Sequence, residues 1–298
     1  METSRRRSER NVWAFFLWTF AYSWLLWLPF VLPGLGVIKP SPVLNALSIP
    51  AVLLGGFAPL FAAVTMVARQ GGWSAVRQYF RQALNLRVKA QYYLLALLLP
   101  LVVTAAAHYI ANWTGMDRLP ATFLPANWPV WVISVAAIGY FVAMLLAGGG
   151  QEEFGWRGYA QEPLQERFGM VRGSLLLGLV WSLWHLPLWL IPTEHHSDYP
   201  FLAFVLSTTS LALIMGCLYN LSGKKLVITW VVHAMNNTVV PFFPVLHMAK
   251  VAQPGYWLWA GLYALTALGL TAWVWRRVKD GRLGEAAEQP PLVRRHVV

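Results

Sequence analysis

Long apolar runs separated by short polar segments dominate this chain. Runs of about 20 apolar residues, the length that crosses a bilayer as a helix, lie at 12–33, 43–68, 90–111, 128–149, 173–191, 200–221, 226–245 and 255–275. The pattern predicts an all-α protein, a polytopic membrane bundle of about eight transmembrane helices. We expect residues 1–280 to form a single integral membrane domain, and 281–298, rich in charge, Gly and Pro, a disordered cytoplasmic tail.

One connection between these runs has a different pattern. In residues 73–89 apolar positions such as Val76 and Tyr79 alternate with basic ones such as Arg77 and Arg81. A helix with one apolar face and one basic face is typical of a segment that lies along the membrane surface. We therefore predict a surface helix after the second span.

Composition and charge support this topology. The chain is 57% hydrophobic and 12% charged, whereas soluble domains carry about 25% charged residues. With eight spans, 20 of the 23 Lys and Arg residues fall on one side, and only Lys39, Arg118 and Lys250 fall on the other. The positive-inside rule then places both termini in the cytoplasm, for a multi-pass protein of the plasma membrane. Because the basic residues punctuate apolar runs and form no basic patch, we expect no nucleic-acid partner.

The first candidate for chemistry follows the glycines at 148–150, where residues 151–157 read Gln-Glu-Glu-Phe-Gly-Trp-Arg. Carboxylates next to lipid are costly, so their presence favours a function. At i, i+4 spacing Glu153 and Arg157 can form an ion pair. Glu152 has no such partner and would be left for chemistry. The alternative is a helix that starts in the cytoplasm with solvated charges.

Two histidines inside apolar runs are the second candidates. Trp181 precedes His185 by one helical turn, and Pro187, which cannot donate its backbone hydrogen bond, predicts a kink beside it. His233 shares a helical face with Asn237. Each histidine alone could simply bond to a neighbouring helix.

Taken together, these side chains could activate a water molecule. Glu152 could take its proton, His185 could orient it or share the proton, and His233 with Asn237 could donate to a developing oxyanion. The candidate catalytic residues are Glu152, Glu153, Arg157, His185, His233 and Asn237.

Metal chemistry stays open as an alternative. Two Glu and two His are enough ligands for Zn²⁺ in number, but their spacing is not a local zinc-binding signature. We therefore assign no cofactor. The chain also lacks a His-Glu-x-x-His helix, a Gly-x-Ser-Gly nucleophile and a pair of membrane aspartates, which argues against other classes of intramembrane protease.

These motifs resemble those of the CPBP (CAAX protease and bacteriocin-processing) intramembrane proteases, relatives of the Rce1-type CAAX prenyl endopeptidases. The family's Glu-Glu-x-x-x-Arg motif is present at 152–157 and its His-x-x-x-Asn motif at 233–237. Its Phe-x-x-x-His motif is met at 181–185, with Trp181 keeping an aromatic side chain in the place of Phe. The resemblance covers about 128–245, and the three motifs in order are far more specific than any one alone.

The resemblance implies a bundle of about eight helices with a site inside the membrane, open toward the cytoplasm. It also implies peptide hydrolysis by a Glu-activated water, the first Glu being essential. The substrate would be a peptide or membrane protein, such as the prenylated Cys-a-a-X tails that eukaryotic relatives cut. A catalytically silent scaffold or bacteriocin-immunity factor of the same fold is the alternative, and a transporter with a proton relay is a third.

The predicted spans place the candidate residues at different depths. His185 lies about 20 Å along its helix from Arg172, whereas His233 lies about 12 Å from Lys225. Glu152 is at the inner edge. We expect the glycines at 148–150 and Pro187 to let the helices dip or bend so that these groups meet.

Overall fold

A computed structural model describes residues 2–248 and 252–279, and every regular element in them is helical. The predicted all-α class is therefore confirmed, whereas the predicted tail at 281–298 lies outside the described residues. The helices are α1 (Glu2–Gly34), α2 (Pro42–Gly56), α3 (Ala58–Ala83), α4 (Ala90–Thr114), α5 (Val130–Leu146), α6 (Glu153–Gly155), α7 (Gln161–Trp184), α8 (Phe201–Leu221), α9 (Leu226–Val239) and α10 (Pro254–Lys279). Four short turns join them, namely η1 (Gly150–Glu152), η2 (Trp156–Ala160), η3 (Leu186–Leu190) and η4 (His195–Asp198).

Six stretches of the described chain are long and apolar enough to cross a membrane, so the chain is an integral membrane protein. They are Val12–Gly34, Pro42–Ala83, Ala90–Thr114, Val130–Leu190, Phe201–Leu221 and Pro254–Arg277. The predicted span 226–245 is shorter as a helix. Its 14 residues in α9 cover about 21 Å. The helix ends two residues before Pro241, whose nitrogen has no hydrogen to donate to a further helical bond. The number of crossings stays a prediction.

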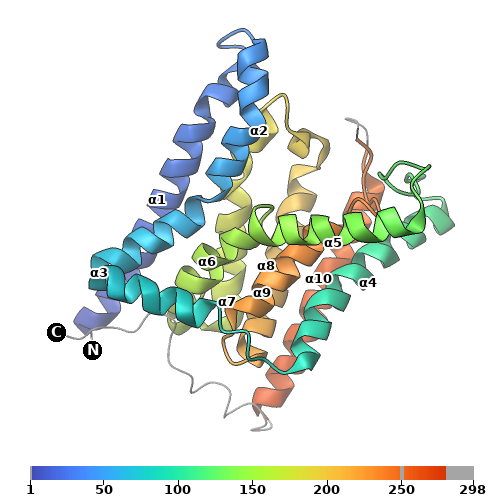
Figure 1. Ribbon diagram of the computed structural model, residues 1–298. Helices are drawn as coiled ribbons and strands as arrows, with labels where there is room; N and C mark the ends of the chain where they lie inside the picture. Colours follow the sequence, from blue (N-terminus) through green and yellow to red (C-terminus); the bar gives the residue numbers. More distant parts are fainter. Residues whose placement is uncertain (1, 249–251, 280–298) are drawn as a thin grey trace.

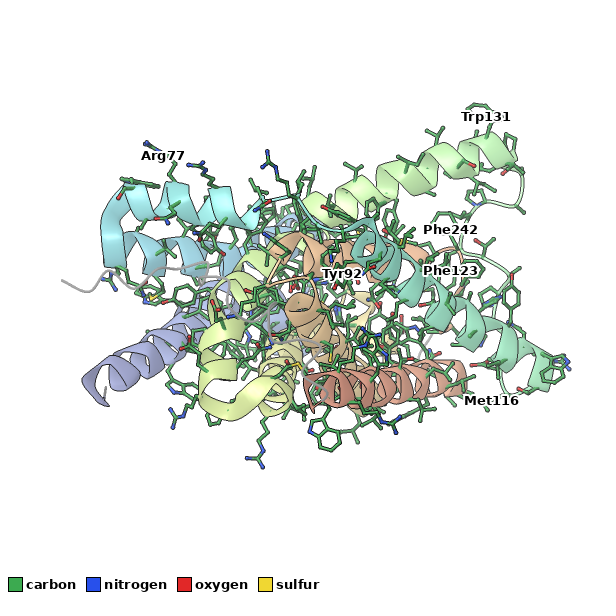
Figure 2. The ribbon with its side chains drawn as sticks, turned by 90° about the horizontal axis from the view of Figure 1, so that it is seen from below. Arg77, Tyr92, Met116, Phe123, Trp131 and Phe242 are labelled. Atoms are coloured by element: carbon green, nitrogen blue, oxygen red, sulfur yellow. The ribbon has the colours of Figure 1, made fainter. Side chains whose placement is uncertain are left out.

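The predicted second span and surface helix are also divided differently. Phe57 separates α2 from α3, and α3 then runs on to Ala83 with a break at Gly71 and Gly72. Beyond that break Val76 and Tyr79 are buried and the Arg77 side chain is exposed, pointing away from the molecule in Figure 2. The amphipathic pattern is confirmed.

Helix α8 forms the centre of the molecule. It packs against α7 on one side and α10 on another, and nearly all its side chains from Leu211 to Leu221 are buried. Helices α7 and α8 approach each other closely at Gly178 of α7. A Cβ atom added there would lie only 2.7 Å from the Cα of Thr209 in α8, so a larger residue would not fit. The helices α1, α2 and α3 lie on one side of this centre, and α4 and α10 lie on the other (Figure 1).

Helix α5 lies across the other helices rather than along them (Figure 1). It is the most apolar of the helices described here, yet none of its residues is buried, and Val130 and Ile138 are 80% and 67% exposed. It packs mainly on α9. Because lipid tails solvate apolar side chains as well as a protein core does, such a helix fits a lipid-facing position.

Candidate active site

The glycine-rich turn after α5 lies beside the middle of α9. The Trp230 indole donates to the carbonyl of Leu145 (2.6 Å), and the Asn237 amide donates to the carbonyl of Gly148 (2.6 Å). The two donors lie seven residues apart on α9. Their bonds hold the end of α5 and the glycine-rich turn against that helix. The expected mismatch in depth between Glu152 and His233 is thereby removed, because α5 crosses the bundle (Figure 1) and the residues after the turn lie level with His233.

Gly149 adopts φ = +120°, a backbone conformation that favours glycine. A Cβ atom added there would collide with Nε2 of His233 and would lie 2.8 Å from Nδ2 of Asn237. The two nitrogen atoms therefore converge on one point beside the Gly149 backbone. The turn needs glycine both for its backbone and for this space.

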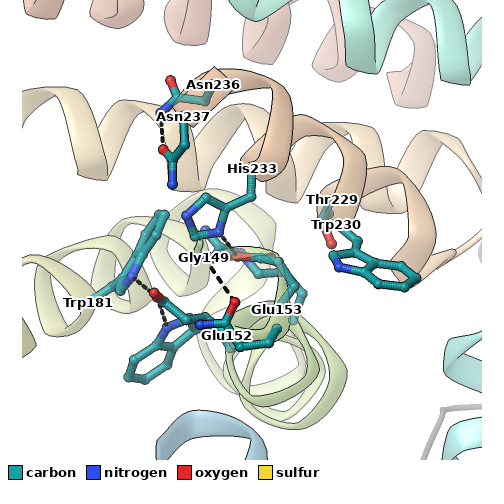
Figure 3. Close-up of polar contacts among 12 residues, drawn as sticks. Gly149, Glu152, Glu153, Trp181, Thr229, Trp230, His233, Asn236 and Asn237 are labelled. Atoms are coloured by element: carbon teal, nitrogen blue, oxygen red, sulfur yellow. Dashed lines mark hydrogen bonds and ion pairs between the residues drawn. The ribbon is translucent and has the colours of Figure 1, made fainter. Parts of the chain in front are cut away.

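Glu153 forms a buried charged cluster with Arg157 and His233. Its Oε1 accepts from Nη1 of Arg157 (2.7 Å) and lies 2.9 Å from Nδ1 of His233 (Figure 3). The Glu153 and Arg157 side chains are 0% exposed. The predicted ion pair is thus present, but through one oxygen rather than as a bidentate fork. With Glu153 ionised, Nδ1–H of His233 donates to it, and Nε2 faces Gly149.

Glu152 is held by two tryptophans. Its Oε2 accepts from the indole of Trp181 (2.9 Å) and from that of Trp156 (3.2 Å), and the residue is 6% exposed (Figure 3). Among the described contacts Glu152 has no ion-pair partner like the Arg157 of Glu153, as expected, but two indole hydrogen bonds that were not predicted from the sequence hold it in place. Both donors are neutral, so Glu152 and Glu153 differ in environment: only Glu153 directly contacts a permanent positive charge.

Arg157 links the two carboxylates through Trp181. Its guanidinium carbon lies 4.6 Å from the centre of the Trp181 ring, a cation–π geometry. The same indole donates to Glu152 and packs edge-on against His233, with ring centres 5.0 Å apart. Trp181 therefore contacts Glu152, Arg157 and His233.

His185 takes a different place from the expected one. Helix α7 ends at Trp184, and Pro187 starts the 3₁₀ turn η3 instead of kinking a continuous helix. The His185 Nδ1 bonds to the Trp181 carbonyl (2.8 Å), and its ring packs against Phe204 and against His196, 6.0 Å away. The contacts described for His185 do not join it to either carboxylate.

Asn237 belongs to a network that reaches α10. Its Oδ1 accepts from Asn236 Nδ2 (2.9 Å), and Oδ1 of Asn236 accepts from the Tyr263 hydroxyl (2.7 Å). The asparagine amide is thereby fixed in one orientation. The role of Tyr263 gives no signal in the sequence, because it comes from a distant helix.

The contact of Trp156 with Glu152 was not predicted either, although the spacing of the two residues indicates it. Trp156 follows Glu152 by four residues and so shares its helical face. The Tyr79 hydroxyl from α3, which donates to the Phe154 carbonyl, had no such signal. Both residues hold the turn that carries the glutamates.

The donor set does not resemble a metal centre. Among the described residues, no group of three His, Cys, Asp or Glu side chains is arranged to hold a metal ion.

Comparison with known proteins gives two matches to this part of the chain. The family model for type II CAAX prenyl endopeptidase Rce1-like proteins matches residues 134–239. A curated relative, CAAX prenyl protease 2 from Methanococcus maripaludis, is 29% identical over 118 residues, which cover 38% of this chain and 44% of that protein. The match thus spans less than half of the curated relative. All six candidate residues lie within the segment that the family model covers.

Proposed function

We propose that this protein is an intramembrane endopeptidase, because residues 134–239 match the family model of the type II CAAX prenyl endopeptidase Rce1-like proteins. In this proposal it hydrolyses a peptide bond with a water molecule that Glu152 activates. The observation that carries the proposal is the pair of adjacent buried carboxylates in two environments. Glu153 is bound to Arg157, whereas Glu152 meets only neutral indole donors at one oxygen.

Glu152 is suited to act as the general base. The indoles of Trp156 and Trp181 fix Oε2, which leaves Oε1 to take a proton from water as its oxygen attacks the peptide carbonyl. A tetrahedral intermediate forms with its charge on the former carbonyl oxygen. Glu152 then returns the proton to the departing amine, the C–N bond breaks, and the carboxylate is restored.

His233 and Asn237 are suited to bind that oxyanion. Their Nε2 and Nδ2 atoms converge beside Gly149, in the space that a Cβ would fill. An imidazolium at His233 donates Nδ1–H to Glu153 and presents Nε2–H to this space. Donors fixed before the reaction stabilise the charge without reorganising. His185 is assigned no step in this scheme.

The substrate we propose is a peptide at the membrane, including one with a lipidated C-terminal tail. The relative's name points to prenylated CAAX tails, and a lipid-facing helix, α5, leads directly into the glycine-rich turn. A substrate anchored by its own lipid would reach such a site from the bilayer.

The test is Glu152→Gln in the purified full chain in lipid nanodiscs. Cleavage of a peptide with a farnesylated Cys-a-a-X end, and of the same peptide without the lipid, is followed by mass spectrometry. Loss of a general base lowers kcat on the order of 10²- to 10⁴-fold. Glu166→Gln, the same change on the exposed surface of α7, is the control and should cleave normally. Unchanged cleavage by the Glu152 variant would overturn the proposal.

A further inference from the structure

A column of buried polar side chains leads away from the active site between α7 and α8. Gln161, one turn after Arg157, is 0% exposed, and its Nε2 donates to Oγ of Ser174 (2.8 Å). The same Nε2 would lie 3.1 Å from a Cβ added at Gly216 of α8. The Gly216 carbonyl accepts from Asn220 Nδ2 (2.6 Å), which also donates to Oε1 of Gln165 (3.1 Å). We call Arg157, Gln161, Ser174, Asn220 and Gln165 the polar column.

Several buried atoms in and beside the polar column have no hydrogen-bond partner among the residues that the structure describes. In the active site they are Oε2 of Glu153 and the Nε and Nη2 atoms of Arg157. Farther along they are Oε1 of Gln161 and Nε2 of Gln165. Leaving one buried polar atom without a partner costs about 1–3 kcal/mol of stability. Several such atoms together therefore indicate that a ligand binds them.

Tyr219 adds a sixth such atom. It precedes Asn220 on α8, its side chain is 0% exposed, and its hydroxyl has no partner in the described part of the chain. By contrast, the hydroxyl of Tyr263, which is equally buried, donates to Asn236.

The chemistry of the unpaired atoms identifies the ligand. They include carboxylate and amide oxygens, guanidinium and amide nitrogens and a hydroxyl, so both donors and acceptors are left unpaired. Water both donates and accepts, and a buried water typically makes 2–4 hydrogen bonds to groups of this kind. A metal ion or an anion would match only half of them.

The polar column ends at the basic side of the molecule. Beyond Gln165 and Asn220, Nζ of Lys224 pairs with Oε1 of Glu162 at 2.5 Å, and both side chains are partly exposed, at 22% and 12%. The loop that carries Lys224 belongs to the side that the charge distribution predicts to be cytoplasmic. The path thus joins a buried site to an aqueous surface.

We propose that the polar column binds a file of water molecules and supplies the active site with water from the cytoplasmic side. Each peptide cleavage consumes one water molecule, and Glu152, Glu153 and His233 are all buried, at 6%, 0% and 4% exposure. A hydrolase surrounded by lipid therefore needs a polar route for its second substrate. The supply role rests on the proposed function; the binding of water does not.

X-ray footprinting of the full chain in nanodiscs tests the binding of water directly. A short X-ray pulse generates hydroxyl radicals from bound water, and mass spectrometry locates the oxidised side chains. Tyr219 should be oxidised several-fold faster than Tyr263, its equally buried control. Equal protection of both tyrosines would overturn the proposal, whether or not the protein cleaves peptides.

Two variants test the supply role. Gln161→Leu and Ser174→Ala should slow the oxidation of Tyr219 and lower kcat several-fold at unchanged KM, because substrate binding is untouched. Ser182→Ala is the matched control, since that buried hydroxyl bonds only to Gly178 of its own helix. Wild-type kcat in both column variants would refute the supply role even if Tyr219 is labelled. If the wild-type protein cleaves no peptide, the proposed function fails, and the footprint alone then decides whether the column binds water.

Discussion

Two indole N–H groups, not charges, hold the carboxylate of Glu152. Trp156 and Trp181 both donate to Oε2, while the positive charge of Arg157 is taken up by Glu153. Single residues thus give two neighbouring glutamates different environments. Trp181 links the two glutamates, because the guanidinium of Arg157 stacks on its ring and the ring also contacts His233.

Trp181→Phe tests this positioning role. The change keeps an aromatic ring, as in the motif that the family shows at this place, but removes the donor to Glu152. A hydrogen bond to a charged group contributes about 1.5–3 kcal/mol, so we expect kcat to fall on the order of tenfold. Peptide cleavage in nanodiscs measures it. Trp189→Phe is the control, because the Trp189 indole donates to the Tyr199 carbonyl and not to Glu152. A similar loss of kcat in both variants would indicate a general packing effect.

Arg157 should matter for stability as well as for activity. Arg157→Met leaves the Glu153 carboxylate buried without its cation, and breaking a buried ion pair costs about 3–5 kcal/mol. Arg157→Lys keeps the charge but loses the planar group that stacks on Trp181, so its loss should be intermediate. Thermal unfolding can be followed with a thiol-reactive dye, because Cys217 is the chain's single cysteine and is buried. Arg172→Met, an exposed arginine of α7, should leave the midpoint unchanged; the same midpoint for Arg157→Met would refute the role of the pair.

At this scale the sequence predicts contacts within one helix and little beyond it. Glu153 with Arg157 followed from their spacing, and Trp156 with Glu152 could have followed in the same way. The place of His185 could not, because it depends on whether Pro187 kinks a helix or ends it. Here the helix ends at Trp184, and the ring turns toward Phe204 and His196.

At the scale of elements, glycine decides where helices approach closely and where they do not. Gly178 of α7 lies against the backbone of Thr209 in α8, whereas Gly139 of α5 has nothing within 4 Å of an added Cβ. Both glycines lie in apolar runs that look alike in the sequence. Apolar periodicity alone could not predict that α7 packs closely on the central helix α8 and that the side chains of α5 are exposed, because a core and a bilayer favour the same side chains.

This contrast gives a matched pair of variants. Gly178→Leu would force α7 and α8 apart, and overpacking of this kind costs about 1–3 kcal/mol. Gly139→Leu adds the same side chain to α5 and should cost nothing. Dye labelling of Cys217 during heating should therefore show an earlier transition only for Gly178→Leu. Equal midpoints would mean that α7 and α8 are not packed as closely as described.

For the whole molecule, the direction of the bundle in the membrane decides which solution feeds the active site. The charge distribution places the surface segment with Arg77 in the cytoplasm and the loop with Met116 on the opposite side. Both side chains are exposed, and Figure 2 shows them at opposite ends of the molecule. The polar column opens at the side that carries Lys224, so its proposed supply of cytoplasmic water depends on this orientation.

Thiol labelling of intact cells tests that orientation. In a Cys217→Ser background, Met116→Cys should react with a membrane-impermeant maleimide added outside, whereas Arg77→Cys should react only after the cells are permeabilised. The reverse pattern would place the basic side outside. The polar column would then draw water from the external solution, and the positive-inside prediction for both termini would be wrong. Labelling of both positions without permeabilisation would contradict the separation of the two ends by a bilayer, on which the topology depends.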